Sequence, residues 1–433
     1  MKIKNLIIGA GISGLSFAYF LKNEDYLILE KDNTYGGYCR TIKKDGFTWD
    51  YAGHFYHFKT EELKKLFLDL VESEELIEKE KCTKIFYKDK LIDFPFQTHI
   101  HQLEKEEFID CLYDLFTKEE IIEKDFLDML YNKFGKSITE KFLKPYNEKL
   151  YATDLAKLDI NAMGRFFPYA DKDEIIKNMK KSKVKSYNAN FWYLRKGTQY
   201  FIDKLYSKLN KDKILFNKEV QHINMKEKYV ELSDGEKIYY DRLINTIPLN
   251  NALSMINGNE NIVKEMSYNK VLVLNLGFKS KSKNFHDEHW IYFPDKSLNF
   301  YRVGFYNNIL GSDKLSLYVE IGFDKNANIN ISKELEDTLK NLEKVGIKDS
   351  NNELESYEAI IMNPAYVHIN KDTQEKIDKI LLENESLGFY TLGRYGKWTY
   401  NSMEDSMLWA KELADKLNSK EKNNDTIFKI NFE

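Results

Sequence analysis

Three glycines near the N-terminus, Gly9, Gly11 and Gly14, have the spacing of a phosphate-binding loop. They follow the apolar run 2–8, which favours a buried parallel strand, and they open the segment 13–22, which favours a helix. In such a unit the first glycine allows a tight turn, the second admits a pyrophosphate, and the third lets the helix pack closely. Free N–H groups at the helix N-terminus then bind phosphate oxygens. This pattern predicts a dinucleotide site.

The acidic residue expected in such a site is Glu30, which follows a second apolar strand over 26–29. Its carboxylate is placed to accept hydrogen bonds from ribose hydroxyls. The stretch from Glu30-Lys31 through Gly36-Gly37 to Arg40 resembles the second signature of the glutathione-reductase-like flavoproteins. Those proteins include amine oxidases, protoporphyrinogen oxidases and sugar-nucleotide mutases, in which this stretch lies along the flavin and pyrophosphate. The resemblance implies FAD rather than NAD.

Composition narrows the classes of partner. The 433 residues carry a formal net charge of -4 with interspersed signs, so neither a nucleic-acid stripe nor a polybasic membrane segment is present. No apolar stretch reaches the length of a membrane-spanning helix, so we expect no membrane insertion. The three cysteines lack metal-ligand or redox spacing, which favours a reducing cytoplasm and no metal site. The sequence does not indicate the oligomeric state.

The order of predicted elements indicates an α/β fold built from separated stretches. Strand signals return at 214–247, 271–278 and 315–323, whereas 60–160 is mainly helical with a short hairpin or loop at 85–95. Further helices are expected over 332–345 and 401–417. We expect a discontinuous Rossmann-like FAD domain (1–70, 195–265 and 385–433), an inserted, mainly helical substrate domain (71–194) and an antiparallel β-sheet substrate domain (266–384).

The later motifs resemble one family, the UDP-galactopyranose mutases, and chiefly its eukaryotic-type branch. The run Trp290-Ile291-Tyr292-Phe293-Pro294, followed by Phe300-Tyr301-Arg302, has the family's Trp-x-Tyr-Phe-Pro and Phe-Tyr-Arg spacing. The run 393–400 resembles its Gly-Arg-Phe-Gly-x-Trp-x-Tyr motif, and Leu194-Arg195-Lys196-Gly197-Thr198 resembles its Arg-Gly-Gly-Thr. Two arginines from different segments suit a diphosphate, since guanidinium forks match phosphate oxygens.

The resemblance implies a set of site residues. Expected catalytic residues are Arg195, Arg302, His54, Tyr400 and Tyr366. Expected cofactor contacts are Gly9, Gly11, Ile12, Ser13, Gly14, Glu30, Lys31, Gly36, Gly37, Arg40, Gly53, His54, Val220, Gly393, Arg394, Ser402 and Met403. Expected substrate contacts are Phe94, Phe96, Gln97, Asn147, Tyr151, Arg195, Trp290, Tyr292, Arg302, Tyr366 and Tyr400. The family has tyrosine at Phe94 and tryptophan at Tyr151, so the base and the sugar remain open.

The resemblance also implies a reaction, because no nucleophilic triad, metal cluster or carboxylate pair emerges from the sequence itself. In the family, N5 of reduced FAD attacks the anomeric carbon of a UDP-hexose. The adduct opens and recloses, which interconverts pyranose and furanose without net redox change. NADH or NADPH is a candidate reductant. The main alternative is an oxidase or desaturase of the amine oxidase or protoporphyrinogen oxidase type. A third is a FAD-bearing binding protein without catalysis.

Overall fold

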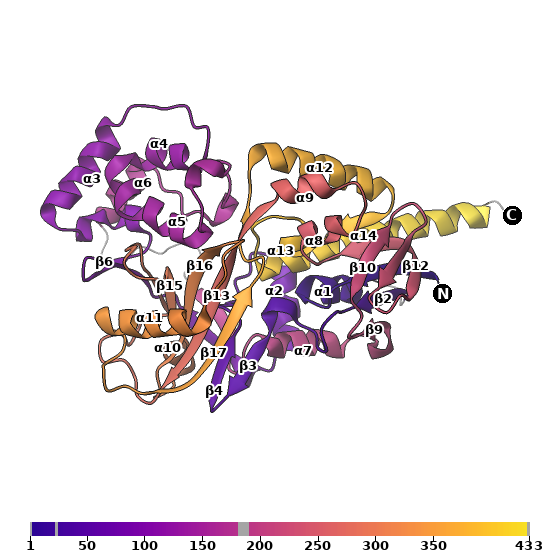
Figure 1. Ribbon diagram of the computed structural model, residues 1–433, viewed down its shortest axis with the longest axis horizontal. Coiled ribbons are helices and arrows are strands. Elements are labelled where there is room, and N and C mark those ends of the chain that lie inside the picture. Colours follow the sequence, from indigo (N-terminus) through magenta and orange to yellow (C-terminus); the bar gives the residue numbers. More distant parts are fainter. Residues whose placement is uncertain (1, 22–24, 181–189, 431–433) are drawn as a thin grey trace.

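The computed structural model describes residues 2–21, 25–180 and 190–430. Within these ranges the chain forms two large sheets, with a group of helices at one end of the molecule (Figure 1). The first sheet has the strand order β10-β11-β12-β1-β2-β9, and β19 pairs with β12. Its strands are β1 (Lys2–Ile8), β2 (Tyr26–Leu29), β9 (Ile214–Leu215), β10 (Val220–Asn224), β11 (Tyr229–Leu232), β12 (Lys237–Asn245) and β19 (Phe389–Thr391).

The centre of the first sheet is parallel. β1 pairs with both β2 and β12 in parallel, and β12 pairs in parallel with β19. Three segments distant in sequence therefore build one sheet, as the recurring strand signals predicted. α1 (Ile12–Phe20) packs against α7 (Gln199–Ser207) and the long α14 (Met403–Ile430). α1 begins close to the predicted start, and Lys22, where we expected it to end, lies outside the described residues.

The second sheet has the strand order β17-β13-β16-β15-β14-β6-β7, and β18 pairs with β13. Its long strands run antiparallel, as expected from the runs 271–278 and 315–323. α11 (Ile331–Lys344) buries Leu342 in the apolar cluster on this sheet and matches the predicted helix at 332–345. The strands are β6 (Thr83–Tyr87), β7 (Lys90–Asp93), β13 (Ser267–Phe278), β14 (Trp290–Tyr292), β15 (Arg302–Phe305), β16 (Ser316–Asp324), β17 (Leu354–Met362) and β18 (Val367–His368).

The region 71–194 is less uniformly helical than predicted. It contributes the hairpin β6–β7 to the second sheet, and β5 (Leu76–Glu80) pairs with β8 (Asn190–Leu194). The hairpin lies where the sequence predicted a short hairpin or loop at 85–95, whereas β5 and β8 are short and far apart in sequence, so local apolar spacing does not reveal their pairing. The helices of this region are α3 (Lys105–Thr117), α4 (Phe126–Ile138), α5 (Lys144–Tyr151) and α6 (Lys172–Met179).

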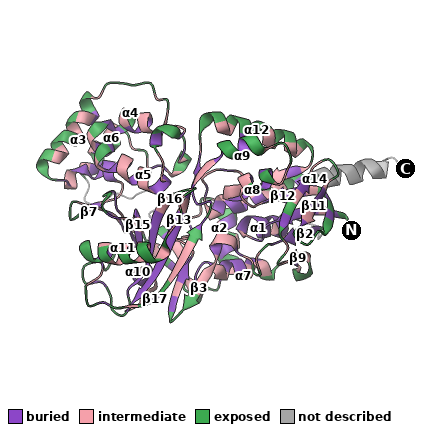
Figure 2. Cartoon of the chain, viewed as in Figure 1, coloured by how far each residue is buried: buried purple, intermediate pink, exposed green. Residues whose placement is uncertain are grey.

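The remaining elements cover the sheets. Most strand residues are buried, whereas the outer faces of α3 and α12 are exposed (Figure 2). Among the described residues, no helix combines the length and apolarity needed to cross a membrane. The elements not yet given are β3 (Thr41–Lys44), β4 (Phe47–Asp50), α2 (Glu61–Leu70), α8 (Leu249–Ser254), α9 (Glu260–Glu265), α10 (Tyr306–Leu310), α12 (Lys371–Ser386) and α13 (Gly393–Gly396).

Candidate functional site

The loop between β1 and α1 presents backbone donors to an anion. Gly9 has a φ of 102°, a left-handed conformation that disfavours a side chain. A Cβ atom added at Gly14 would collide with the carbonyl oxygen of Gly9, so the helix packs tightly on the turn. Within the described chain no side chain caps α1 at Gly11, and its first turn holds no acidic residue. The helix N-terminus therefore offers N–H groups to a phosphate.

The glycine pair Gly36-Gly37 brings a second loop against the loop between β1 and α1. The N–H of Gly36 donates to the carbonyl oxygen of Ala10 at 2.9 Å. Gly36 and Gly37 both have positive φ, of 111° and 56°. Gly37 approaches the Cα atom of Gly11, and a Cβ atom at Gly37 would lie 3.4 Å from it. The two loops together form a narrow backbone cradle, which fits a pyrophosphate.

Charged side chains line the far end of this cradle. The buried Glu30 carboxylate accepts hydrogen bonds from the N–H groups of Ala10 at 2.8 Å and Asp32 at 3.0 Å. Lys31 and Arg40 line the same cavity, and Nη1 of Arg40 forms an ion pair with Asp32 at 2.9 Å. The placement of Glu30 fits a ribose beyond the glycine loop, as in dinucleotide-binding units.

The C-terminal motif reaches the same cavity. Gly393 has a φ of 77°, and a Cβ atom there would collide with Oγ of Ser13 in α1. The guanidinium of Arg394 lies 4.3 Å from the ring centroid of Tyr400 and 5.1 Å from that of Tyr366. Its Nη2 is buried without a hydrogen-bond partner among the described residues. Such an unpaired donor is costly unless a ligand accepts from it.

Arg302 and Glu320 form an ion pair on the neighbouring strands β15 and β16. The two residues pair in register, with Nε 3.0 Å from Oε2 and Nη2 2.6 Å from Oε1. The hydroxyl of Tyr301 also donates to Oε2, at 2.6 Å. Burial lowers the pKa of Arg302, but the carboxylate of Glu320 more than compensates and leaves that pKa well above its usual range. Arg302 is therefore a fixed positive charge on the cavity wall.

His54 is a neutral group in the cavity. Its Nδ1 lies 3.1 Å from the carbonyl oxygen of Ala52, so the tautomer protonated at Nδ1 donates this hydrogen bond. Burial, assisted by the positive charge of Arg394, lowers the pKa of His54 to about 4. At neutral pH, Nε2 is consequently an acceptor rather than a charged donor.

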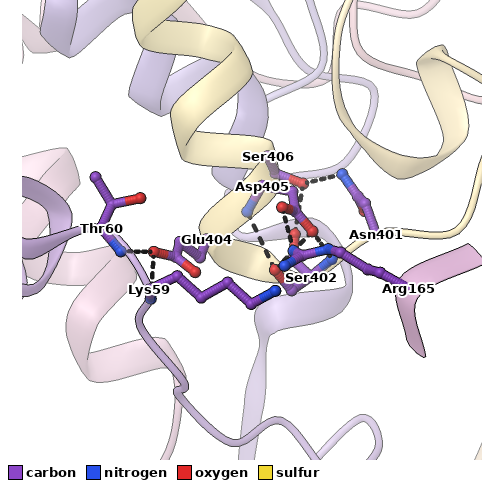
Figure 3. A network of polar contacts seen from close by, with 8 residues as sticks. All are labelled: Lys59, Thr60, Arg165, Asn401, Ser402, Glu404, Asp405 and Ser406. Carbon is purple, nitrogen blue, oxygen red and sulfur yellow. Dashed lines mark hydrogen bonds and ion pairs between the residues drawn. The ribbon is translucent and has the colours of Figure 1, made fainter. Parts of the chain in front are cut away.

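Arg165, which none of the sequence motifs includes, reaches the cavity from the helical region. It belongs to the single turn η7 (Gly164–Phe166) and forms an ion pair with Asp405 in the first turn of α14 (Figure 3). The same carboxylate accepts hydrogen bonds from the N–H and the hydroxyl of Ser402, both at 2.8 Å. The ring of Phe166 meets that of Tyr400 edge to face, with centroids 4.8 Å apart. The start of α14 is thus joined to the helical region.

Glu404 ties the same turn of α14 to a third segment. Its buried Oε1 accepts from the N–H groups of Lys59 at 2.8 Å and Thr60 at 2.7 Å (Figure 3). Lys59, Arg165 and Ser402 all line the cavity. Three segments distant in sequence therefore meet at this edge of the site.

These groups surround one continuous cavity of about 1090 Å³. Most expected cofactor contacts line it: Gly9, Gly11, Ile12, Ser13, Glu30, Lys31, Gly36, Gly37, Arg40, Gly53, His54, Arg394, Ser402 and Met403. Five expected substrate contacts also line it: Phe94, Trp290, Tyr292, Arg302 and Tyr400. The volume exceeds the roughly 300–1,000 Å³ that is usual for the site of one small ligand. The cavity is therefore large for a site that binds one small ligand.

Several expected contacts lie behind the lining. Gly14 and Gly393 act through close packing, and Val220 is buried in β10. Tyr366 stacks on Tyr400 with ring centroids 5.7 Å apart, so it supports that tyrosine from behind.

Four expected substrate contacts, Phe96, Gln97, Asn147 and Tyr151, are buried in the helical region outside the lining. Three of their polar atoms have no hydrogen-bond partner among the described residues: Oε1 of Gln97, Oδ1 of Asn147 and the hydroxyl of Tyr151. The amide nitrogen of Gln97 donates to the carbonyl oxygen of Pro168, which does line the cavity. Pro168 therefore lies between Gln97 and the cavity.

The expected clamp of Arg195 with Arg302 is not present. Arg195 is exposed, lies outside the cavity lining, and donates from Nε to the carbonyl oxygen of Glu74 at 3.1 Å. It follows β8, whose pairing with β5 directs the chain toward 74–75. Thr198 of the same motif is buried, and its N–H and hydroxyl donate to the carboxylate of Asp50 at 3.0 and 2.7 Å.

The small number of arginines in the sequence is a further signal, which the motifs do not use. The chain has six arginines, at positions 40, 165, 195, 242, 302 and 394, although lysine is abundant. Four of them, Arg40, Arg165, Arg302 and Arg394, line the cavity. Because arginine is so rare here, each one was a candidate anion ligand on sequence grounds.

Comparisons with known proteins place the N-terminal part of the chain among dinucleotide-binding domains. Residues 7–70 match the model of the NAD(P)-binding Rossmann-like domain. A coproporphyrinogen III oxidase from Staphylococcus aureus (strain NCTC 8325 / PS 47) is 27% identical over 326 residues. That match covers 65% of this chain and 69% of the relative.

Solved structures extend the likeness to nearly the whole chain. A crystal structure of reduced UDP-galactopyranose mutase superposes with a TM-score of 0.90 and 24% identity, over 96% of each chain. A structure from Exiguobacterium sp. 255-15, described as a protoporphyrinogen oxidase, gives 0.75 and 17%, over 97% of this chain and 99% of that one. The chain therefore has the fold of UDP-galactopyranose mutase, and its residues 7–70 match a Rossmann-like dinucleotide-binding domain, as the glycine motif predicts.

Proposed function

We propose that this protein is a cytoplasmic, FAD-dependent mutase that interconverts the pyranose and furanose forms of a UDP-hexose. The observation that carries the proposal is the single cavity of about 1090 Å³. It joins a dinucleotide cradle at Gly9 and Glu30 to a wall that holds Arg302 and Tyr400. A diphosphate substrate needs a cation such as Arg302, whereas an apolar substrate does not.

The cradle supports FAD as the cofactor. The glycine loop, the uncapped start of α1 and the Glu30 carboxylate fit the pyrophosphate and a ribose. Arg394 lines the same cavity beside Tyr400 and would lie along the flavin ring system. When bound and reduced, FAD would supply the nucleophile for the anomeric carbon, with no net redox change. NADH or NADPH would serve to reduce it initially.

The protein's own part is to hold the diphosphate. Arg302 is fixed by Glu320 and offers a permanent positive charge to the phosphate oxygens as the negative charge develops. Arg165 would supply the second guanidinium in place of Arg195, because Arg165 lines the same cavity as Arg302. Arg165 is already paired with Asp405, so a bound diphosphate would compete with that carboxylate for the guanidinium. Retaining the leaving group nearby favours its return.

The buried group around Gln97 supports a base subsite. The unpaired oxygens of Gln97 and Asn147 and the hydroxyl of Tyr151 suit the polar edge of a pyrimidine. Displacement of the Pro168 carbonyl from Gln97 would connect the Gln97 amide with the cavity. Pro168, which covers Gln97, follows Arg165 by three residues, so both line the cavity from one segment.

The alternative is an oxidase acting on an apolar or amine substrate. The likeness to coproporphyrinogen III oxidase favours it, since that relative is 27% identical over 326 residues. Titration of the FAD-loaded protein separates the two functions. A mutase shifts its flavin absorbance when UDP is added, and coproporphyrinogen leaves the flavin oxidised. Rapid flavin reduction by coproporphyrinogen without any response to UDP would overturn the mutase proposal. No response to either would indicate a FAD-bearing binding protein.

A further inference from the structure

Tyr318 lies on the cavity wall next to Arg302, in a position that no sequence motif marks. It is on β16, two residues before Glu320, so both side chains leave the same face of the strand. Tyr318 pairs in register with Gly304 of β15. A Cβ atom added at Gly304 would collide with the Tyr318 ring. The missing side chain therefore provides the space in which the phenol crosses β15.

The hydroxyl of Tyr318 ends beside the Gly53-His54 segment. A Cβ atom added at Gly53 would lie 2.5 Å from this oxygen. Tyr318, Gly53, His54 and Arg302 all line the cavity. The Tyr318 phenol is thus located between His54, which we assign to the flavin, and Arg302, which we assign to the diphosphate.

The Tyr318 hydroxyl is unengaged, unlike those of its neighbours. The Tyr301 hydroxyl donates to Glu320 at 2.6 Å, and the Tyr306 hydroxyl donates to the carbonyl oxygen of Ala52 at 3.2 Å. Among the residues that the structure describes, the Tyr318 hydroxyl has no such partner, and it is not one of the fully enclosed unpaired atoms. It therefore faces the cavity. Burial raises the pKa of Tyr318 well above its usual value, so the phenol stays neutral.

We propose that Tyr318 contacts the substrate and donates a hydrogen bond to a hydroxyl of its sugar ring. This inference rests on the proposed function. A sugar linked to a diphosphate at Arg302, with its anomeric carbon toward the flavin, must occupy the space between Arg302 and Gly53. The hydroxyl of Tyr318 borders this space.

The neighbouring wall suits a sugar as well. The rings of Phe55 and Trp290 stack with centroids 5.1 Å apart and an interplanar angle of 9°. Both residues line the cavity. Flat aromatic faces bind the C–H surface of a pyranose, while a phenol hydroxyl satisfies its polar edge. An apolar substrate would leave the Tyr318 hydroxyl unpaired, which is unfavourable.

The test compares UDP with UDP-galactose on the oxidised, FAD-loaded Tyr318→Phe variant, with both dissociation constants measured by calorimetry. The variant keeps the ring and removes one hydroxyl that has no protein partner, so its fold and FAD content should be unchanged. We expect the Kd of UDP-galactose to rise about tenfold, as for one lost hydrogen bond, and the Kd of UDP to stay unchanged. Tyr240→Phe is the matched control, because Tyr240 is buried in β12 away from the cavity.

The outcomes separate the two levels of the proposal. An equal loss for UDP and UDP-galactose places the Tyr318 contact on the diphosphate and overturns the sugar contact. Unchanged values for both ligands overturn any role of Tyr318 in binding. If the unmodified protein binds neither UDP nor UDP-galactose, the nucleotide-sugar function itself fails.

Discussion

The carboxylate of Glu320 holds the guanidinium of Arg302 through contacts of 3.0 Å to Nε and 2.6 Å to Nη2 across two adjacent strands. Glu320 is almost fully buried, whereas Arg302 is partly open to the cavity. A planar fork held in this way is oriented before any ligand arrives. Preorganised positive charge is more effective on developing phosphate charge than a charge that must reorient during the reaction.

Arg302→Lys should therefore lower kcat more than its conserved charge suggests. Lysine keeps the positive charge but cannot pair with Glu320 through two nitrogens. We expect kcat to fall by about 10²–10³, as when a preorganised donor is lost from a transition state. Steady-state turnover of the reduced enzyme measures this, and FAD absorbance shows that the cofactor is retained. An unchanged kcat would contradict the assigned role of Arg302.

Arg165 and Arg195 give a matched pair of variants. Arg165 lines the cavity, and Arg195 is exposed outside it. We expect Arg165→Ala to weaken UDP binding by about tenfold or more, because a charge-assisted hydrogen bond contributes about 1.5–3 kcal/mol. Arg195→Ala should leave the Kd of UDP unchanged. Calorimetric titration with UDP decides the matter, and the reverse pattern would restore the assignment made from the sequence.

Gly393 should be required for FAD binding. Alanine at this position meets Oγ of Ser13 and adopts a φ of 77°, so the C-terminal motif would be displaced from α1. Gly46→Ala is the control, because Gly46 has a φ of 82° but no atom within 4 Å of the added Cβ. Purified Gly393→Ala should contain little FAD, and Gly46→Ala should contain as much as the unmodified protein. Equal FAD content in both variants would refute the packing argument.

Stability should fall as the solution becomes acidic. Burial lowers the pKa of His54, His57, His289 and His368 from 6.5 to about 4. Between these values the unfolded chain binds more protons than the folded chain, so the free energy of unfolding decreases as pH falls from 6.5 to 4. Urea titrations across this window measure the slope.

His368→Gln tests one contribution to that slope. His368 is buried away from the cavity lining, so the variant should keep the cofactor. Its free energy of unfolding should depend less steeply on pH between 4 and 6.5 than that of the unmodified protein. Parallel curves for the two proteins would show that His368 does not remain neutral in the fold.

Local sequence rules predicted the cofactor cradle well. Gly9 and Gly14 act through backbone geometry and Glu30 through its carboxylate, all within one short unit whose geometry depends mainly on nearby residues. The motifs around Trp290 and Arg302 also lie on the cavity wall, because one hairpin, β14–β15, carries both. The elements that these motifs occupy are continuous in sequence, so their spacing carries spatial information.

The sequence did not predict the direction of side chains whose contacts lie in distant segments. Arg195 belongs to a recognisable motif, but the pairing of β8 with β5 turns it toward Glu74. Arg165 lies in an irregular segment and meets Asp405, 240 residues further along the chain. Neither periodicity nor spacing encodes such a contact, since it depends on how the helical region packs on α14.

The proposed function requires that the reduced flavin and the arginine-lined cavity act together on a nucleotide sugar. Dithionite-reduced protein should be incubated with UDP-galactose under nitrogen, and the products separated by chromatography and identified by NMR. We expect a UDP-furanose product that is formed by the reduced protein, is absent with the oxidised protein, and is strongly diminished with Arg302→Lys. Absence of furanose from UDP-galactose and from a panel of other nucleotide sugars would contradict it.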